Sequence, residues 1–136
     1  RSCARGGGAS MISKIALISE RSMRDLAYAD DGSGESNIDF LFNMQTPEGR
    51  PWPHELTVHV EIRPEKAPND SEPVFSADVC YAVAFSGEKV SDKLTPEMLA
   101  DLWPYVRPGL VVQLRRYDLS SAILPLSIGF EAGGHR

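Results

Sequence analysis

The side chains best suited to chemistry in this chain of 136 residues are three histidines and two cysteines. His54, His59 and His135 do not have the spacing of metal ligands. His59 points outward on a predicted strand, where a lone exposed histidine usually has no chemical role. Cys80 lies in a predicted buried strand without a basic neighbour in the sequence, so an activated thiolate is not expected. We therefore expect no catalytic residue, no bound metal and no cofactor.

Glycine motifs and bulk properties narrow the function classes further. The chain has no nucleophile elbow, no P-loop and no dinucleotide-binding glycine motif, and its glycine triplet at 6–8 follows no predicted strand. The net charge of −5 gives no electrostatic reason to expect nucleic-acid binding. No apolar run reaches the roughly 18 residues of a membrane span, so we expect no membrane insertion. Cys3 lies in a glycine-rich leader and Cys80 lies within a predicted strand, so we expect no disulfide between them. We therefore expect the protein in the reducing cytoplasm.

The length predicts a single domain. Residues 1–10 are basic and glycine-rich but lack the apolar core of a signal peptide. We interpret them as a disordered leader or a non-native extension, with the natural start at Met11. The domain is expected to cover 11–131, and 132–136 to form a frayed tail.

The segment Val74–Phe85 alternates between apolar and other residues, which is typical of a β-strand. Its opposite face ends in the small residues Cys80, Ala82 and Ala84, so we expect a helix or a second subunit to cover that side too. This segment is interpreted as a central strand. The apolar face consists of Phe75, Ala77, Val79, Tyr81, Val83 and Phe85.

Three further strands are predicted before it. Residues 12–18 fit a strand, although their apolar positions also suit a short helix. A long loop is expected over 19–37, and strands over 37–44 and 56–63. The second of these four strands places Ile38, Phe40, Phe42 and Met44 on one face. Strands that follow one another without intervening helices predict antiparallel, meander-like pairing.

The pattern changes to a helical period after Thr95, which can cap a helix that begins at Pro96. Pro104 and Pro108 each suit the first turn of a helix and disfavour a helix interior. We therefore expect one short helical turn, and then a main helix that begins between these prolines and ends near Tyr117. The predicted fold class is α+β.

Three motifs in this order carry a resemblance to a known family. The helix begins with Leu102, Trp103, Pro104, Tyr105, Val106 and Arg107. The strand before it presents Phe75, Val79, Tyr81 and Phe85, and the segment after it contains Leu124, Pro125 and Leu126. Their order and spacing are similar to those of the SecB family of export chaperones, over roughly Ile12 to Phe130. Either of the first two motifs alone is weak, whereas the two together are fairly specific.

The resemblance implies a four-stranded antiparallel sheet with helices packed on one face, and a homotetramer built as a dimer of dimers. Proteins of this family are ATP-independent holdases that bind unfolded preproteins and deliver them to the SecA motor for translocation. A smaller branch shields aggregation-prone antitoxins. This sequence ends in GGHR where some members carry a long acidic tail that contacts SecA, and its crossover loop reads DDGSGES. These departures favour an alternative, a SecB-like chaperone or adaptor dedicated to one partner such as an antitoxin.

The resemblance also assigns roles to residues, each with a structural alternative. A holdase needs accessible, adaptable apolar surface. The expected client-binding residues are Ile38, Phe40, Phe42, Met44, Trp103 and Tyr105, and ordinary core packing is the alternative for all of them. Leu110, Val111 and Leu114 are expected at an oligomer interface or in a plain core stripe. The acidic surface for the motor is expected at Glu20, Asp25, Asp70 and Glu72, which solvated loop charges would explain as well. Trp52 is either a groove rim or a turn anchor.

Overall fold

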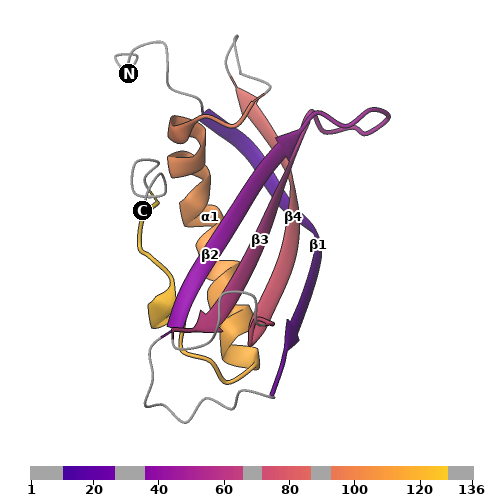
Figure 1. The fold of residues 1–136 in the computed structure, drawn as a ribbon. Coiled ribbons are helices and arrows are strands. Elements are labelled where there is room, and N and C mark those ends of the chain that lie inside the picture. Colours follow the sequence, from indigo (N-terminus) through magenta and orange to yellow (C-terminus); the bar gives the residue numbers. More distant parts are fainter. Residues whose placement is uncertain (1–10, 27–35, 66–71, 87–92, 129–136) are drawn as a thin grey trace.

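The structure, a computed structural model, describes residues 11–26, 36–65, 72–86 and 93–128. Predictions for 1–10, for Asp70 and for 132–136 lie outside these ranges. The elements are β1 (Met11–Arg24), β2 (Ser36–Gln45), β3 (His54–Pro64), β4 (Phe75–Ser86), α1 (Pro96–Arg116) and the 3-10 turn η1 (Ser121–Ile123). Figure 1 shows two layers, with α1 lying across one face of the sheet. The predicted α+β class with a four-stranded antiparallel sheet is confirmed, with one α-helix in the described part of the chain.

The strands lie in the order β1-β4-β3-β2, and all neighbours are antiparallel. Strands β2, β3 and β4 form the predicted meander. Pairing of β1 with its sequence neighbour β2 would have completed that meander, and this expectation was wrong because β1 pairs with β4. The three consecutive strands β2, β3 and β4, with β1 paired beside β4, make a Greek key. The segment Val74–Phe85 is confirmed as a central strand.

Strand β1 is longer than predicted and continues through Arg24, so the first part of the predicted loop belongs to the sheet. Its pairing with β4 shifts register between Ile12 and Lys14, and again between Leu17 and Ser19. Each shift places an extra residue in the strand and moves the following side chains to the other face. The two bulges explain why the sequence of β1 lacks clean alternation and why a short helix fitted it too.

Helix α1 is one continuous helix, which corrects the predicted break between Pro104 and Pro108. Thr95 caps it as expected, since its Oγ1 accepts a hydrogen bond of 3.2 Å from the Met98 backbone nitrogen. Both internal prolines are exposed, so the carbonyls that lose their helical partners lie on the water-facing side. Each such proline costs about 3 kcal/mol, whereas each buried side chain on the inner face contributes about 1.5–3 kcal/mol. That face consists of Met98, Leu99, Leu102, Trp103, Val106, Leu110, Gln113 and Leu114.

The core lies between α1 and the sheet face formed by β3 and β4, which carries Val58 and Val60 on β3 and Phe75, Val79 and Tyr81 on β4. Gly109 of α1 permits a close approach there, because a Cβ at this position would stand 3.2 Å from the Tyr81 hydroxyl oxygen. On the other face of the sheet, no described helix or strand covers Cys80, which is partly exposed. The described part of the chain therefore does not supply the expected helix on that side, and the alternative cover, a second subunit, stays a prediction. We call this side the open face.

Candidate functional site

The helix-facing side of the edge strand β2 carries three half-buried apolar residues, Ile38, Phe40 and Phe42. The rings of Phe40 and Phe42 stack with their centroids 5.7 Å apart. Trp103 meets both rings edge-on, at centroid distances of 5.3 Å and 6.2 Å. Such edge-to-face contacts fix the aromatic side chains without removing them fully from solvent. We refer to Ile38, Phe40 and Phe42 as the apolar band.

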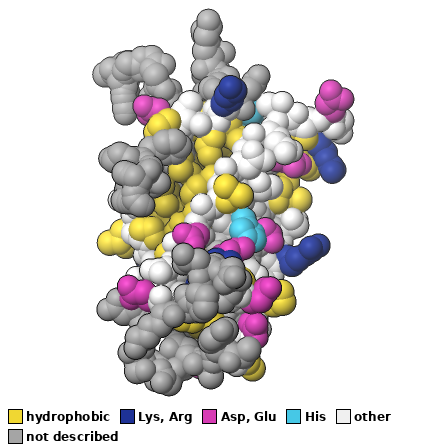
Figure 2. Space-filling view, in the orientation of Figure 1, with side chains coloured by type: hydrophobic (Ala, Val, Ile, Leu, Met, Phe, Trp, Pro, Cys, Tyr) yellow, Lys and Arg dark blue, Asp and Glu magenta, His cyan; other side chains and the backbone are white. Residues whose placement is uncertain are grey.

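Trp103 joins this band to the C-terminal part of the domain. Its side chain is 1% exposed, and its Nε1–H donates to the Pro125 carbonyl oxygen at 3.0 Å. Arg107 Nε donates to the same oxygen, also at 3.0 Å. The next residue, Leu126, is 82% exposed. Figure 2 shows hydrophobic side chains gathered beside β2 and over α1.

The structure separates the residues that were expected to bind clients. It brings Ile38, Phe40, Phe42 and Trp103 together, but Trp103 is buried and serves as their support. Met44 is only 8% exposed and belongs to the core, which leaves it little surface for a client. Tyr105 is 54% exposed on the opposite side of α1, since two helical residues differ by about 200°. The expectation that Trp103 and Tyr105 belong to one client-binding surface was therefore wrong.

The expected interface residues mostly face inward. Leu110 and Leu114 are each 1% exposed and pack in the core, and Val111 is partly buried against it. Residues buried in their own subunit have no surface for another, so the interface role of Leu110 and Leu114 is corrected to core packing. The exposed positions of α1 from 102 to 114 are all uncharged. These positions, which we call the outer helix face, are Pro104, Tyr105, Pro108 and Val112.

The expected acidic surface is likewise divided. Glu20 lies within β1 rather than after it, and accepts a hydrogen bond of 2.7 Å from Gln113 Nε2. Arg116 Nη1 stands 3.8 Å from the other Glu20 oxygen, so this carboxylate holds α1 against the edge strand. Asp25 follows β1, and its backbone N–H donates to the carbonyl oxygen of Val74, just before β4. Glu72 is exposed in the segment that leads into β4. A motor-binding role for these residues stays a prediction.

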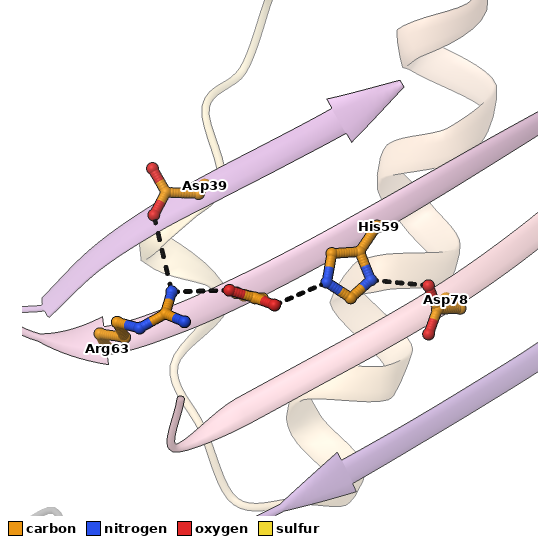
Figure 3. Close-up of polar contacts among 5 residues, drawn as sticks. Asp39, His59, Arg63 and Asp78 are labelled. Atoms are coloured by element: carbon orange, nitrogen blue, oxygen red, sulfur yellow. Dashed lines mark hydrogen bonds and ion pairs between the residues drawn. The ribbon is translucent and has the colours of Figure 1, made fainter. Parts of the chain in front are cut away.

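A chain of polar contacts crosses the open face, and Figure 3 shows it on three strands. His59 Nδ1 lies 2.6 Å from Asp78 Oδ1, and its Nε2 lies 2.8 Å from Glu61 Oε2. Arg63 Nη1 is 2.6 Å from the other Glu61 oxygen and 4.0 Å from Asp39 Oδ2. The interpretation of His59 as a lone histidine was wrong. Its alternation with Glu61 and Arg63 on one strand face was a visible signal, whereas its contact with Asp78 depends on strand register.

These polar contacts shift the pKa values of His59 and Glu61. Hydrogen bonds to Glu61 and then to Asp78 raise the pKa of His59. Hydrogen bonds from His59 and then from Arg63 lower the pKa of Glu61. The His59–Asp78 contact joins β3 to β4, whereas the His59–Glu61 contact lies within β3. Within the ranges that the structure describes, no three side chains are grouped as metal ligands.

Two other residues singled out in the sequence lie near one carboxylate. Burial and then the charge of Glu55 raise the pKa of the Cys80 thiol, which keeps it protonated at neutral pH. Trp52 Nε1 donates to Glu55 Oε2 at 3.1 Å, and the Arg50 guanidinium lies 5.6 Å from the centroid of the Trp52 ring system. These contacts favour the turn-anchor interpretation of Trp52. Among the described helices, none is long and apolar enough to cross a membrane.

Comparisons with known proteins bear on the fold. No protein-family profile and no curated protein sequence matches this chain. Among solved structures it is similar to the Mycobacterium tuberculosis Rv1957 SecB-like chaperone, solved in complex with a ChAD peptide from the Rv1956 HigA1 antitoxin. The TM-score is 0.54 at 18% identity, over 87% of this chain and 90% of that one. The fold is SecB-like. The SecB resemblance of the sequence motifs is thus confirmed at the level of the fold.

Proposed function

We propose that this SecB-like protein is an ATP-independent holdase that binds unfolded preproteins for export. The observation that supports the proposal best is the apolar band, in which two stacked phenylalanines remain partly exposed on an edge strand. Partly exposed apolar surface of this kind is a feature of interaction sites. The proposed activity is reversible binding, so it needs no catalytic group.

The band is suited to weak, adaptable binding. Each large apolar client side chain that becomes buried contributes about 1.5–3 kcal/mol, and ordering the client chain offsets part of this gain. Phe40 and Phe42 offer ring edges and faces rather than a shaped pocket, which favours many apolar side chains over one. Trp103 holds both rings in place from the core side. This combination supports the proposed binding of many different clients.

Assembly and partners complete the proposal. The outer helix face is uncharged and includes Tyr105 and Val112, which are 54% and 51% exposed. We propose that it forms the contact between dimers in a homotetramer, in the cytoplasm. Asp25, which follows β1, and Glu72, which precedes β4, are proposed to face a basic motor such as SecA.

The test compares two half-buried phenylalanines. Phe42 belongs to the apolar band, whereas Phe85 packs on β4 beside His54, with ring centroids 5.3 Å apart. Phe42→Ser should lower the affinity for a fluorescent unfolded preprotein about tenfold or more, since at least 1.4 kcal/mol of burial is lost. Phe85→Ser should lose similar stability and keep its affinity. Equal affinities of both variants and the wild type would contradict the proposed site.

A second candidate function is a chaperone or adaptor dedicated to one partner such as an antitoxin. It is favoured by one observation, namely that the similar Rv1957 structure contains an antitoxin peptide. Anisotropy titrations with several unrelated unfolded proteins distinguish the two functions. Similar affinities for all of them support the general holdase. Binding to a single antitoxin peptide alone supports the dedicated chaperone or adaptor. Tight binding of SecA counts against that second function.

A further inference from the structure

The outer edge of β2 carries backbone groups that can bind another strand. β2 lies at one end of the sheet and pairs only with β3. The Asn43 carbonyl accepts a 3.3 Å hydrogen bond from Thr57 Oγ1 on β3, so carbonyls at odd-numbered positions face β3. Because hydrogen-bonding directions alternate along an antiparallel strand, the backbone groups of Phe40 and Phe42 face outward. Within the described ranges, no backbone hydrogen bond joins this outer edge to another segment.

The two edges of the sheet differ in how they are protected. β1 carries two register shifts and the charged residues Lys14 and Arg21. Bulges and charges are the usual devices that stop an edge strand from pairing with other chains. β2 pairs over ten residues without a shift, and 40–45 contains no charge and no proline. The uncharged part of the β2 edge, 40–45, also carries Phe40 and Phe42 of the apolar band, and Asp39 is the charged residue just before it.

We propose that the outer edge of β2 binds an extended segment of an unfolded client as a fifth strand of the sheet. The inference rests on the proposed holdase function and assigns how the client backbone is held. The partner is an uncharged segment with apolar side chains at alternate positions and free backbone N–H groups. Its side chains on one face lie beside Phe40 and Phe42, and those on the other face lie beside Leu41, which is 67% exposed.

Strand addition accounts for weak sequence selectivity. Backbone hydrogen bonds form with any residue except proline, so they supply affinity without selecting side chains. The apolar band then favours segments that are rich in apolar side chains, because such segments are buried in folded proteins and exposed in unfolded ones. The edge supplies the backbone contacts and the band supplies the preference for apolar segments.

The first test uses a synthetic ten-residue peptide of alternating valine and threonine, and two forms N-methylated at odd or at even positions. Fluorescence anisotropy should show one methylated form binding at least about tenfold more weakly, since it loses several backbone hydrogen bonds. The other form should bind nearly as well as the parent. Equal binding of all three forms overturns strand addition but leaves the holdase function standing. No binding of the parent peptide, with no binding of unfolded preprotein, overturns both.

The second test locates the bound strand by amide hydrogen exchange. Adding the peptide should slow exchange at Phe40 and Phe42, whose N–H groups face outward. Leu41 and Asn43 should change little, because their amides already face β3. Uniform slowing along β2, or slowing confined to other elements, overturns the proposal. Slowing at Phe40 and Phe42 without peptide, increasing with protein concentration, would show that a second copy of the chain occupies the edge and would also overturn it.

A pair of matched variants provides the third test. Leu41 and Met23 are 67% and 63% exposed on the open face, and they lie on opposite edge strands. Leu41→Lys places a charge beside the proposed client strand and should weaken peptide binding about tenfold. Met23→Lys should leave the affinity unchanged. Both side chains are exposed, so neither change should affect folding. Equal effects of the two variants overturn the assignment to β2.

Discussion

Trp103 and Tyr105 lie two residues apart on α1, and the structure predicts opposite consequences of replacing them with alanine. Trp103 is 1% exposed and contacts Phe40, Phe42 and the Pro125 carbonyl. Tyr105 is 54% exposed on the outer helix face. Trp103→Ala should therefore destabilise the protein strongly, whereas Tyr105→Ala should change its stability little.

The magnitude follows from burial. A tryptophan buries about 150–250 Å², and at about 25 cal/mol per Å² its loss removes roughly 4–6 kcal/mol. Losing the Nε1–H bond adds little, because Arg107 still donates to the Pro125 carbonyl and no acceptor is left without a partner. We expect a cost of about 4 kcal/mol, a large part of the 5–15 kcal/mol that stabilises a typical domain. The expected cost of Tyr105→Ala is below about 1 kcal/mol.

Urea unfolding followed by far-ultraviolet circular dichroism measures both changes, at one protein concentration because assembly contributes to stability. The Trp103→Ala midpoint should fall sharply with an unchanged slope. Thermal unfolding should show a decrease of roughly 10–20 °C in Tm. A cost below about 1 kcal/mol for Trp103→Ala, or an equal cost for both variants, would refute the assignment of Trp103 to the core.

Three further predictions concern other parts of the fold. The pKa of His59 is raised, so its contribution to folding stability is fully present below about pH 6.5 and is lost as the pH rises through the folded pKa. The pKa of Glu61 is lowered, so its contribution to folding stability is lost in acid, below about pH 4.5. His59→Gln should therefore cost about 0.5–1 kcal/mol near pH 6 and less near pH 9 in urea unfolding, and a difference independent of pH would contradict this. Val112→Asp should lower the mass in solution, measured by light scattering, without changing the fold, and an unchanged oligomer would exclude the outer helix face as an interface. Gly109→Val should cost about 1–3 kcal/mol in thermal unfolding because its side chain crowds the Tyr81 hydroxyl, and an unchanged or higher Tm would show that the contact relaxes freely.

The sequence predicted those strands whose alternation is uninterrupted. β3 and β4 each bury one face and β2 half-buries one, so period two was visible in their residues. β1 escaped full prediction because its bulges reverse the side-chain alternation twice. Its pairing with β4 is a contact between distant segments, and periodicity carries no information on partners. The continuous helix was missed because local proline chemistry was weighed without the packing of its inner face.

The candidate site was predicted to a similar extent. Alternation alone placed Ile38, Phe40 and Phe42 on one face. The position of Trp103 relative to Tyr105 depended on the helical phase, which a break at Pro104 or Pro108 would have reset. The contact of His59 with Asp78 required the register of β3 on β4, which the sequence does not reveal.

The holdase function itself is tested most directly by aggregation of a chemically unfolded client, diluted from denaturant and followed by light scattering without nucleotide. We predict that the protein at a stoichiometric ratio suppresses the scattering, and that Phe42→Ser suppresses it less than Phe85→Ser does. Aggregation that proceeds unchanged in a stoichiometric excess of the wild-type protein would contradict the proposed function.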